Sequence, residues 1–153
     1  MLVVEKAFAY ITWDSRLLVF DHVAFPEAGT QVPAGTIVRG EAPAMAAIRE
    51  AREETGLSQF SSPAYLGALD FDARPSGKDE THRRFFFHLP LLGSAPERWR
   101  HHEQHPSASH ENGIEFELYW VSLPDAAARL AHGHGALLDV LAMALPNKPL
   151  QRT

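Results

Sequence analysis

Three glutamates stand close together in a stretch that should be helical. Residues 44–55 contain neither glycine nor proline and include Glu50, Glu53 and Glu54. At about 100° per residue, Glu53 and Glu54 fall within about 60° on either side of Glu50, so the three carboxylates form one stripe. Their mutual repulsion costs roughly a few tenths of a kcal/mol per pair, and a hard cation such as Mg²⁺ would remove it. The stripe therefore favours a divalent-metal site for a phosphorylated substrate, and a solvated helix face with incidental glutamates is the alternative.

The other side of this predicted helix is mostly apolar and should pack on a sheet, with the carboxylates facing away from it. The residues on that side are Ala44, Met45, Ile48, Ala51 and Thr55. Pro43 suits the first helical turn, and Gly56 suits a left-handed helix end. Arg49 precedes Glu53 by four residues, so the two side chains can pair along the helix.

The elements that must position this helix are predicted from periodicity and composition. Aromatic, β-branched or alternating stretches predict strands at residues 3–13, 16–22, 65–71, 83–89 and 114–123. Asp14 and Ser15 form the turn of a hairpin. Helical patterns follow at residues 125–132 and 136–145. Because strands and helices are mixed in one core, the fold class is α/β or α+β.

Composition bounds the protein further. The chain has 153 residues, of which 45% are hydrophobic and 22% charged, so we expect a single globular domain over residues 1–153. We find no apolar run long enough to span a membrane and no signal peptide. There are no cysteines, which excludes disulfides and thiolate metal sites and fits a cytoplasmic location. A net charge of −5 argues against binding to duplex nucleic acid.

One long segment lacks apolar periodicity. Residues 93–113 include two prolines and four histidines, and we expect a loop that is either functional or mobile. Within it, residues 101–105 (His-His-Glu-Gln-His) do not follow the zinc-protease spacing, and Pro106 would end any helix there. We therefore favour a polar loop that covers a substrate over a metal site in these histidines.

Residues 35–57 resemble the Nudix box, the signature of the Nudix hydrolase family. The family pattern is Gly, five residues, Glu, seven residues, Arg-Glu, an aliphatic residue, any residue, Glu-Glu, any residue, Gly and an aliphatic residue. The matching positions are Gly35, Glu41, Arg49, Glu50, Glu53, Glu54, Gly56 and Leu57. Ala51 is smaller than the aliphatic residue usual there. At roughly 7% per fixed position, such a match arises by chance on the order of 10⁻⁸ times per window.

This resemblance implies an α/β fold, a Nudix-type α/β/α sandwich with a mixed sheet between helices. It implies hydrolysis of a nucleoside diphosphate linked to another moiety X, by metal-activated attack of water on phosphorus. The implied ligands of Mg²⁺ or Mn²⁺ are Glu50, Glu53 and Glu54, with the backbone carbonyl of Ala34 as a further one. Ala34 stands where the family has a glycine, so it must reach the backbone conformation needed there without the conformational freedom of glycine. Of the other box residues, Arg49 would orient a glutamate, Glu41 would brace the loop, and Gly35 and Gly56 would serve the loop turns.

The family takes its general base from the box in some members and from a later loop in others. Glu111, Glu115 and Glu117 are the later candidates. We favour Glu115 as an extra ligand or base because it opens the strand after the long segment, where an ordinary exposed strand residue is the alternative. In the family the region equivalent to residues 93–113 often closes over the substrate, so we expect this segment to become ordered with nucleotide and metal.

The sequence does not name X. Asp72 stands where the family's ADP-ribose enzymes carry a proline, and a chain without cysteine does not fit the isopentenyl diphosphate isomerase branch. Arg83 or Arg84 is expected to bind substrate phosphate, but not both, since adjacent strand residues face opposite ways. The expected partner is a small nucleotide derivative, and a homodimer is compatible with the sequence. A nucleotide-sensing binding module without turnover is the alternative function.

Overall fold

Strand β1 (Leu2–Trp13) is the centre of the sheet in this computed structural model, which describes residues 2–103 and 113–146. It pairs in parallel with β5 (Glu80–Pro90) and antiparallel with β2 (Arg16–His22) and the short β3 (Ala34–Thr36). β4 (Ala64–Asp72), β6 (Arg98–His102) and β7 (Glu115–Val121) complete a seven-stranded mixed sheet in the order β4-β5-β1-β2-β7-β6, with β3 beside β1. Asp14 and Ser15 close the β1–β2 hairpin with φ of 52° and 62°, as a primed turn requires.

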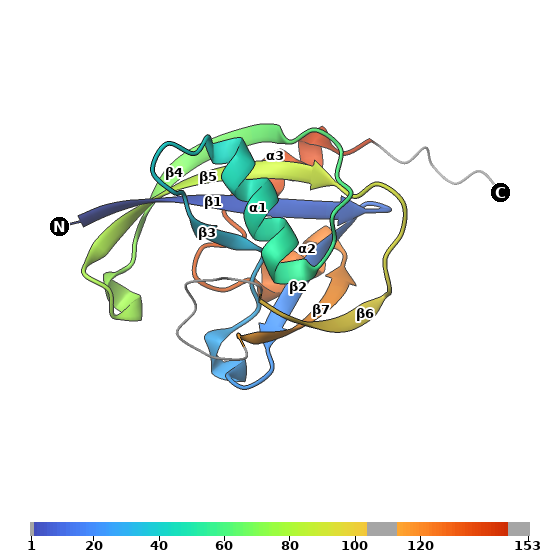
Figure 1. Ribbon diagram of the computed structural model, residues 1–153, viewed down its shortest axis with the longest axis horizontal. Coiled ribbons are helices and arrows are strands. Elements are labelled where there is room, and N and C mark those ends of the chain that lie inside the picture. The colour runs from blue at the N-terminus through green and yellow to red at the C-terminus, as the bar shows by residue number, and fades with distance from the viewer. Residues whose placement is uncertain (1, 104–112, 147–153) are drawn as a thin grey trace.

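Helices cover both faces of this sheet. α1 (Pro43–Thr55) lies on one face, and α2 (Leu123–Arg129) and α3 (Leu138–Ala144) lie on the other (Figure 1). The side chains of β1 alternate accordingly. Ala7 and Ala9 belong to the core cluster under α1, whereas Phe8 and Tyr10 belong to the cluster under α2 and α3. The expected α/β/α sandwich is confirmed.

The face that α1 buries includes Ala44, Ile48, Ala51 and Thr55 as expected, but it excludes Met45 and extends to two glutamates. Met45 is 56% exposed, while Glu50 and Glu54 are only 3% and 6% exposed. The alanines Ala46 and Ala47 are fully buried on the same side as these glutamates. Small side chains let the helix approach the sheet closely, and the two carboxylates then fit beside β3. The prediction that the whole carboxylate stripe faces away from the sheet is therefore wrong for Glu50 and Glu54.

The described part of the segment 93–113 contains a strand that the sequence analysis does not predict. Residues 98–102 form the edge strand β6, which pairs antiparallel with β7 from Arg98↔Tyr119 to His102↔Glu115. An edge strand with one face in solvent can carry many polar residues, which is why it lacks apolar periodicity. Residues 104–112 of the expected closing loop, with Glu111, lie outside the described residues. In the described residues no helix has the length and apolarity needed to cross a membrane.

Candidate metal centre

Three carboxylates from two elements converge beside β3. Glu50 and Glu54 of α1 and Glu103, which directly follows β6, each offer an oxygen, and these oxygens lie within 4.8 Å of one another. Two of the three side chains are buried. A buried set of carboxylate oxygens at this separation suits a hard divalent cation, which takes oxygen ligands.

Gly35 makes room for Glu50. A Cβ atom added to Gly35 would lie 2.1 Å from both Cδ and Oε1 of Glu50, far inside van der Waals contact. Gly35 is not among the residues with positive φ. It is therefore required in strand β3 for the close approach of a carboxylate rather than for a loop turn, which corrects the expectation drawn from the family pattern.

Glu54 is the most strongly perturbed carboxyl of the group. Burial raises its pKa well above the usual value, and the neighbouring charges of Glu50 and Glu103 add to the effect. Its Oε1 accepts a hydrogen bond from the backbone N–H of Ala34 at 2.8 Å, which fixes its orientation. The donor set thus holds more negative charge than its protein surroundings neutralise, and a divalent cation fits that imbalance.

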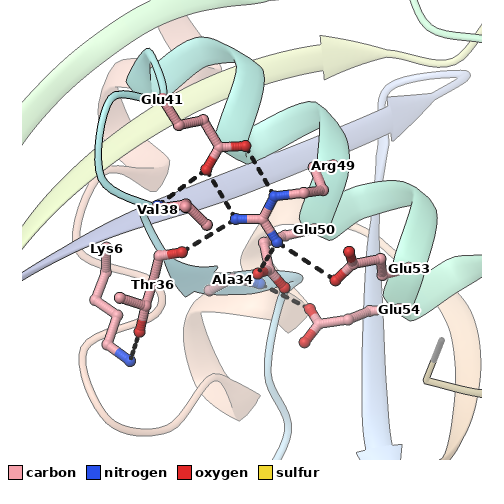
Figure 2. A network of polar contacts seen from close by, with 9 residues as sticks. All are labelled: Lys6, Ala34, Thr36, Val38, Glu41, Arg49, Glu50, Glu53 and Glu54. Atoms are coloured by element: carbon pink, nitrogen blue, oxygen red, sulfur yellow. Dashed lines mark hydrogen bonds and ion pairs between the residues drawn. The ribbon is translucent and has the colours of Figure 1, made fainter. Parts of the chain in front are cut away.

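Arg49 ties the helix to the loop that precedes it (Figure 2). Its Nε and Nη2 donate to the two Glu41 carboxylate oxygens at 2.8 and 2.9 Å, and Nη1 donates to Glu50 Oε1 at 2.7 Å. The hydrogen bonds between Glu41 and Arg49 are the main cause of the lowered pKa of Glu41 and of the raised pKa of Arg49. Glu41 also accepts from the backbone N–H of Val38 at 3.0 Å. One guanidinium therefore fixes both the loop and a carboxylate of the group.

Glu53 lies at the margin of the group. Its Oε2 is 3.4 Å from Arg49 Nη1, and it is not one of the three clustered carboxylates. α1 ends two residues later at Thr55. Its C-cap is Gly56, which has φ +78° and ψ −6° and donates its N–H to the carbonyl of Arg52. Gly56 is the box glycine whose positive φ requires the conformational freedom of glycine.

β6 is docked on the end of α1 by two side chains. Trp99 Nε1 donates to the carbonyl of Thr55 at 2.9 Å, and His101 Nε2 lies 3.1 Å from the carbonyl of Glu53, to which it can only donate. Trp99, His101 and Glu103 follow one another at a spacing of two and so share a strand face. This docking carries Glu103 to Glu50 and Glu54.

Glu103 is the site residue that sequence reasoning missed. The candidates considered outside the box were Glu111, Glu115 and Glu117, while Glu103 was assigned to a polar loop. The available signal was the alternation of Trp99, His101 and Glu103. The structure instead places Glu115 beside Arg100 and His102, at 4.0 and 3.9 Å, outside the carboxylate group.

The two candidate arginines face opposite ways, as strand geometry requires. Arg83 is exposed and lies 3.2 Å from Asp70. Arg84 is 3% exposed and lines a cavity of about 160 Å³ that also borders Gly35. Of the two, only Arg84 lines this cavity, which reaches the carboxylate group at Gly35.

Comparisons with known proteins identify a family and a shared fold. The family model described as NUDIX domain matches residues 5–141. No curated protein matches the chain. Among solved structures, a NUDIX hydrolase from Nitrosomonas europaea is similar, with 22% identity, 98% of this chain and 97% of that chain covered, and a TM-score of 0.65.

Two further structures share the fold at the same TM-score of 0.65. A MutT NUDIX hydrolase from Burkholderia pseudomallei is 20% identical over 92% of this chain and 99% of its own. The E. coli dihydroneopterin triphosphate pyrophosphohydrolase is 17% identical over 95% of this chain and 100% of its own. At these identities the likeness shows the fold alone.

Proposed function

The chain belongs to the Nudix family of hydrolases, which act on phosphoanhydride bonds, and from this we propose that it cleaves the pyrophosphate of a nucleoside diphosphate linked to a further group X. The proposal includes a dependence on Mg²⁺ or Mn²⁺. The observation that carries it is the convergence of Glu50, Glu54 and Glu103, whose carboxylate oxygens lie within 4.8 Å of one another.

We assign the metal to these three carboxylates. Glu53 and the backbone carbonyl of Ala34 complete the proposed ligand set, because both residues adjoin it through Arg49 and Glu54. When bound, a divalent cation supplies Lewis-acid chemistry, which neutralises charge on the pyrophosphate and acidifies the attacking water.

The residues of the chain then have distinct tasks. Arg49 holds Glu50 and the N–H of Ala34 holds Glu54, so two carboxylates are oriented before substrate arrives. Glu103 comes from a separate element and faces both. We propose that Glu103, ahead of Glu115, takes the proton from the attacking water.

The test is a panel of nucleoside diphosphate derivatives incubated with Mg²⁺ or Mn²⁺, with products followed as nucleoside monophosphate and phosphate. The expected result is turnover of at least one compound that stops when the metal is chelated. Tight nucleotide binding without turnover under both metals would favour the binding-module alternative.

We also propose that residues 1–153 form one domain. The NUDIX match spans residues 5–141, and both hydrophobic clusters of the described residues lie on the same sheet.

A further inference from the structure

A small cavity adjoins the carboxylate group on the side of β5. Its volume is about 160 Å³, and its lining includes Lys6, Gln31, Gly35, His82, Arg84 and His134. Gly35 borders both this cavity and the Glu50 carboxylate. A substrate whose pyrophosphate lies at the carboxylates can therefore place a neighbouring group in the cavity. Drug-sized ligands occupy roughly 300–1,000 Å³, so this volume suits one chemical group rather than a whole nucleoside.

Arg84 is an unusual residue to line such a cavity. It is 3% exposed, and its Cζ lies 3.7 Å from the ring centroid of Phe71 and 4.7 Å from that of Phe8. Within the part of the chain that the structure describes, its Nε has no hydrogen-bond acceptor and no carboxylate forms an ion pair with it. A buried guanidinium without a direct counter-charge favours the approach of an anion.

Arg84 Nη1 donates to the carbonyl of His132 at 2.5 Å, and within the described residues the link from Arg84 to a carboxylate runs through a histidine. Arg84 Nη2 lies 3.2 Å from His82 Nδ1, and His82 Nε2 lies 2.8 Å from Glu80 Oε1. Because a guanidinium only donates, Nδ1 must accept, and the ring proton sits on Nε2 and is given to Glu80. His82 is thus neutral, in agreement with the lowering of its pKa by burial. It orients Arg84 without neutralising it.

The remaining lining adds positive charge and no acid. Lys6 donates to Thr36 Oγ1 at 2.9 Å, which uses one of its three ammonium protons. His134 is buried, and burial lowers its pKa to about 3, so this ring contributes no charge. None of the cavity's lining residues is an aspartate or a glutamate. The lining therefore carries the positive charges of Lys6 and Arg84 and no negative charge, while the Glu50 and Glu80 carboxylates act on Lys6 from outside the lining.

The cavity offers no free aromatic face for a nucleobase. Phe8 is its one phenylalanine, tyrosine or tryptophan, and its ring is already covered by Phe86 at 4.7 Å, His134 at 4.8 Å and Arg84. The walls are also fixed in place. His134 Nδ1 accepts from the N–H of Val32 at 3.1 Å, and Tyr10 donates to the carbonyl of His134 at 2.6 Å.

We propose that this cavity is an anion subsite, in which Arg84 and Lys6 bind a phosphate or carboxylate group carried by the X portion of the substrate. The inference rests on the proposed function and makes it narrower: the preferred substrates are nucleoside diphosphate derivatives with one anionic group beyond the pyrophosphate. A hydrogen bond to a charged group is worth roughly ten- to a hundredfold in affinity.

The first experiment measures binding without turnover. Inorganic phosphate is titrated into metal-free protein by isothermal calorimetry, for wild type, Lys6→Met, Arg84→Met and Arg84→Lys. Lys78→Met is the matched control, since Lys78 is exposed and does not line the cavity. We expect the phosphate Kd to rise about tenfold or more in Lys6→Met and Arg84→Met, less in Arg84→Lys, and not at all in Lys78→Met. Circular dichroism reports whether Arg84→Met still folds. If Arg84→Met does not fold, the phosphate Kd of Lys6→Met decides whether the cavity binds phosphate.

The second experiment uses pairs of substrates that differ by one anionic group. ADP-ribose and ADP-ribose 1″-phosphate differ by a phosphate on the X portion, and UDP-glucose and UDP-glucuronate differ by a carboxylate there. We expect a lower KM for the more anionic member of one pair, and a loss of that KM preference in Lys6→Met. The pair that shows the preference identifies the anion.

The two proposals fail in different ways. Phosphate binding that depends on Lys6 and Arg84, without turnover of any compound, would contradict the hydrolase proposal and leave the subsite intact. Turnover with no preference for the anionic members, together with a phosphate Kd unchanged in Lys6→Met, would overturn the subsite.

Discussion

Replacing Gly35 by alanine should disable the site through a single methyl group. The added Cβ would lie 2.1 Å from Glu50 Cδ and Oε1 and 2.5 Å from Oε2, so the carboxylate must leave its place. That movement breaks the 2.7 Å contact between Glu50 and Arg49 and separates Glu50 from Glu54 and Glu103. Backbone movement of β3 is restrained, because β3 pairs with β1 from Lys6↔Thr36 to Phe8↔Ala34.

The magnitude follows from overpacking and from the lost ligand. Forcing a methyl group into a filled site costs roughly 1–3 kcal/mol of stability. For a domain of this size, this lowers the Tm by roughly 2–12 °C. Displacing one carboxylate from the metal should lower kcat by about 10²-fold or more, because the charge stabilisation that it supports is lost.

The assay combines thermal unfolding with phosphate release at saturating Mn²⁺. Gly135→Ala is the matched control, because Gly135 also lacks a positive φ and its added Cβ would meet nothing nearer than Leu138 at 3.3 Å. We expect this control to keep its activity. A Gly35→Ala protein with wild-type kcat and Tm would contradict the claim that Gly35 in β3 makes the room that the Glu50 carboxylate needs.

Three further predictions concern the same carboxylates. Glu103→Gln should lower kcat by about 10²-fold, while Glu115→Gln should change it less than about threefold. Equal losses of kcat in steady-state assays of the two variants would contradict the assignment of Glu103, ahead of Glu115, to the site. Glu54 has a raised pKa, so the folded protein holds its proton to higher pH than the unfolded chain, and this contribution to stability is lost as pH rises above about 4.5. In the presence of EDTA, the free energy of unfolding of wild type relative to Glu54→Gln should therefore fall as the pH rises above about 4.5, and a difference that stays constant with pH would rule the idea out. Trp99→Phe removes the hydrogen bond to Thr55 and should weaken Mn²⁺ affinity several-fold through Glu103, which a calorimetric titration with unchanged affinity would disprove.

The parts of the fold that follow from local pattern could be predicted from the sequence. The alternation in β7 and the turn at Asp14 and Ser15 depend on neighbouring residues alone. The end of α1 at Gly56 is also local, because a left-handed residue suits glycine there. These elements lie within a residue or two of their expected positions.

The parts that were missed depend on tertiary contacts. β3 has only three residues and is a strand because β1 pairs with it. β6 is polar and is held by β7 and the end of α1. A helical wheel treats glutamate as solvent-facing, so it could not show that Gly35 opens a buried place for Glu50. Glu103 could be found only once β6 was known to be a strand.

The central claim is that Glu50, Glu54 and Glu103 bind the divalent cation that pyrophosphate hydrolysis needs. The most direct test is a calorimetric titration of Mn²⁺ into wild type and Glu54→Gln, with nucleotide hydrolysis measured on the same samples. We predict that Glu54→Gln weakens Mn²⁺ binding by about tenfold or more and lowers kcat by at least about 10²-fold, while circular dichroism shows an intact fold. Unchanged Mn²⁺ affinity and hydrolysis in a folded Glu54→Gln protein would contradict the claim.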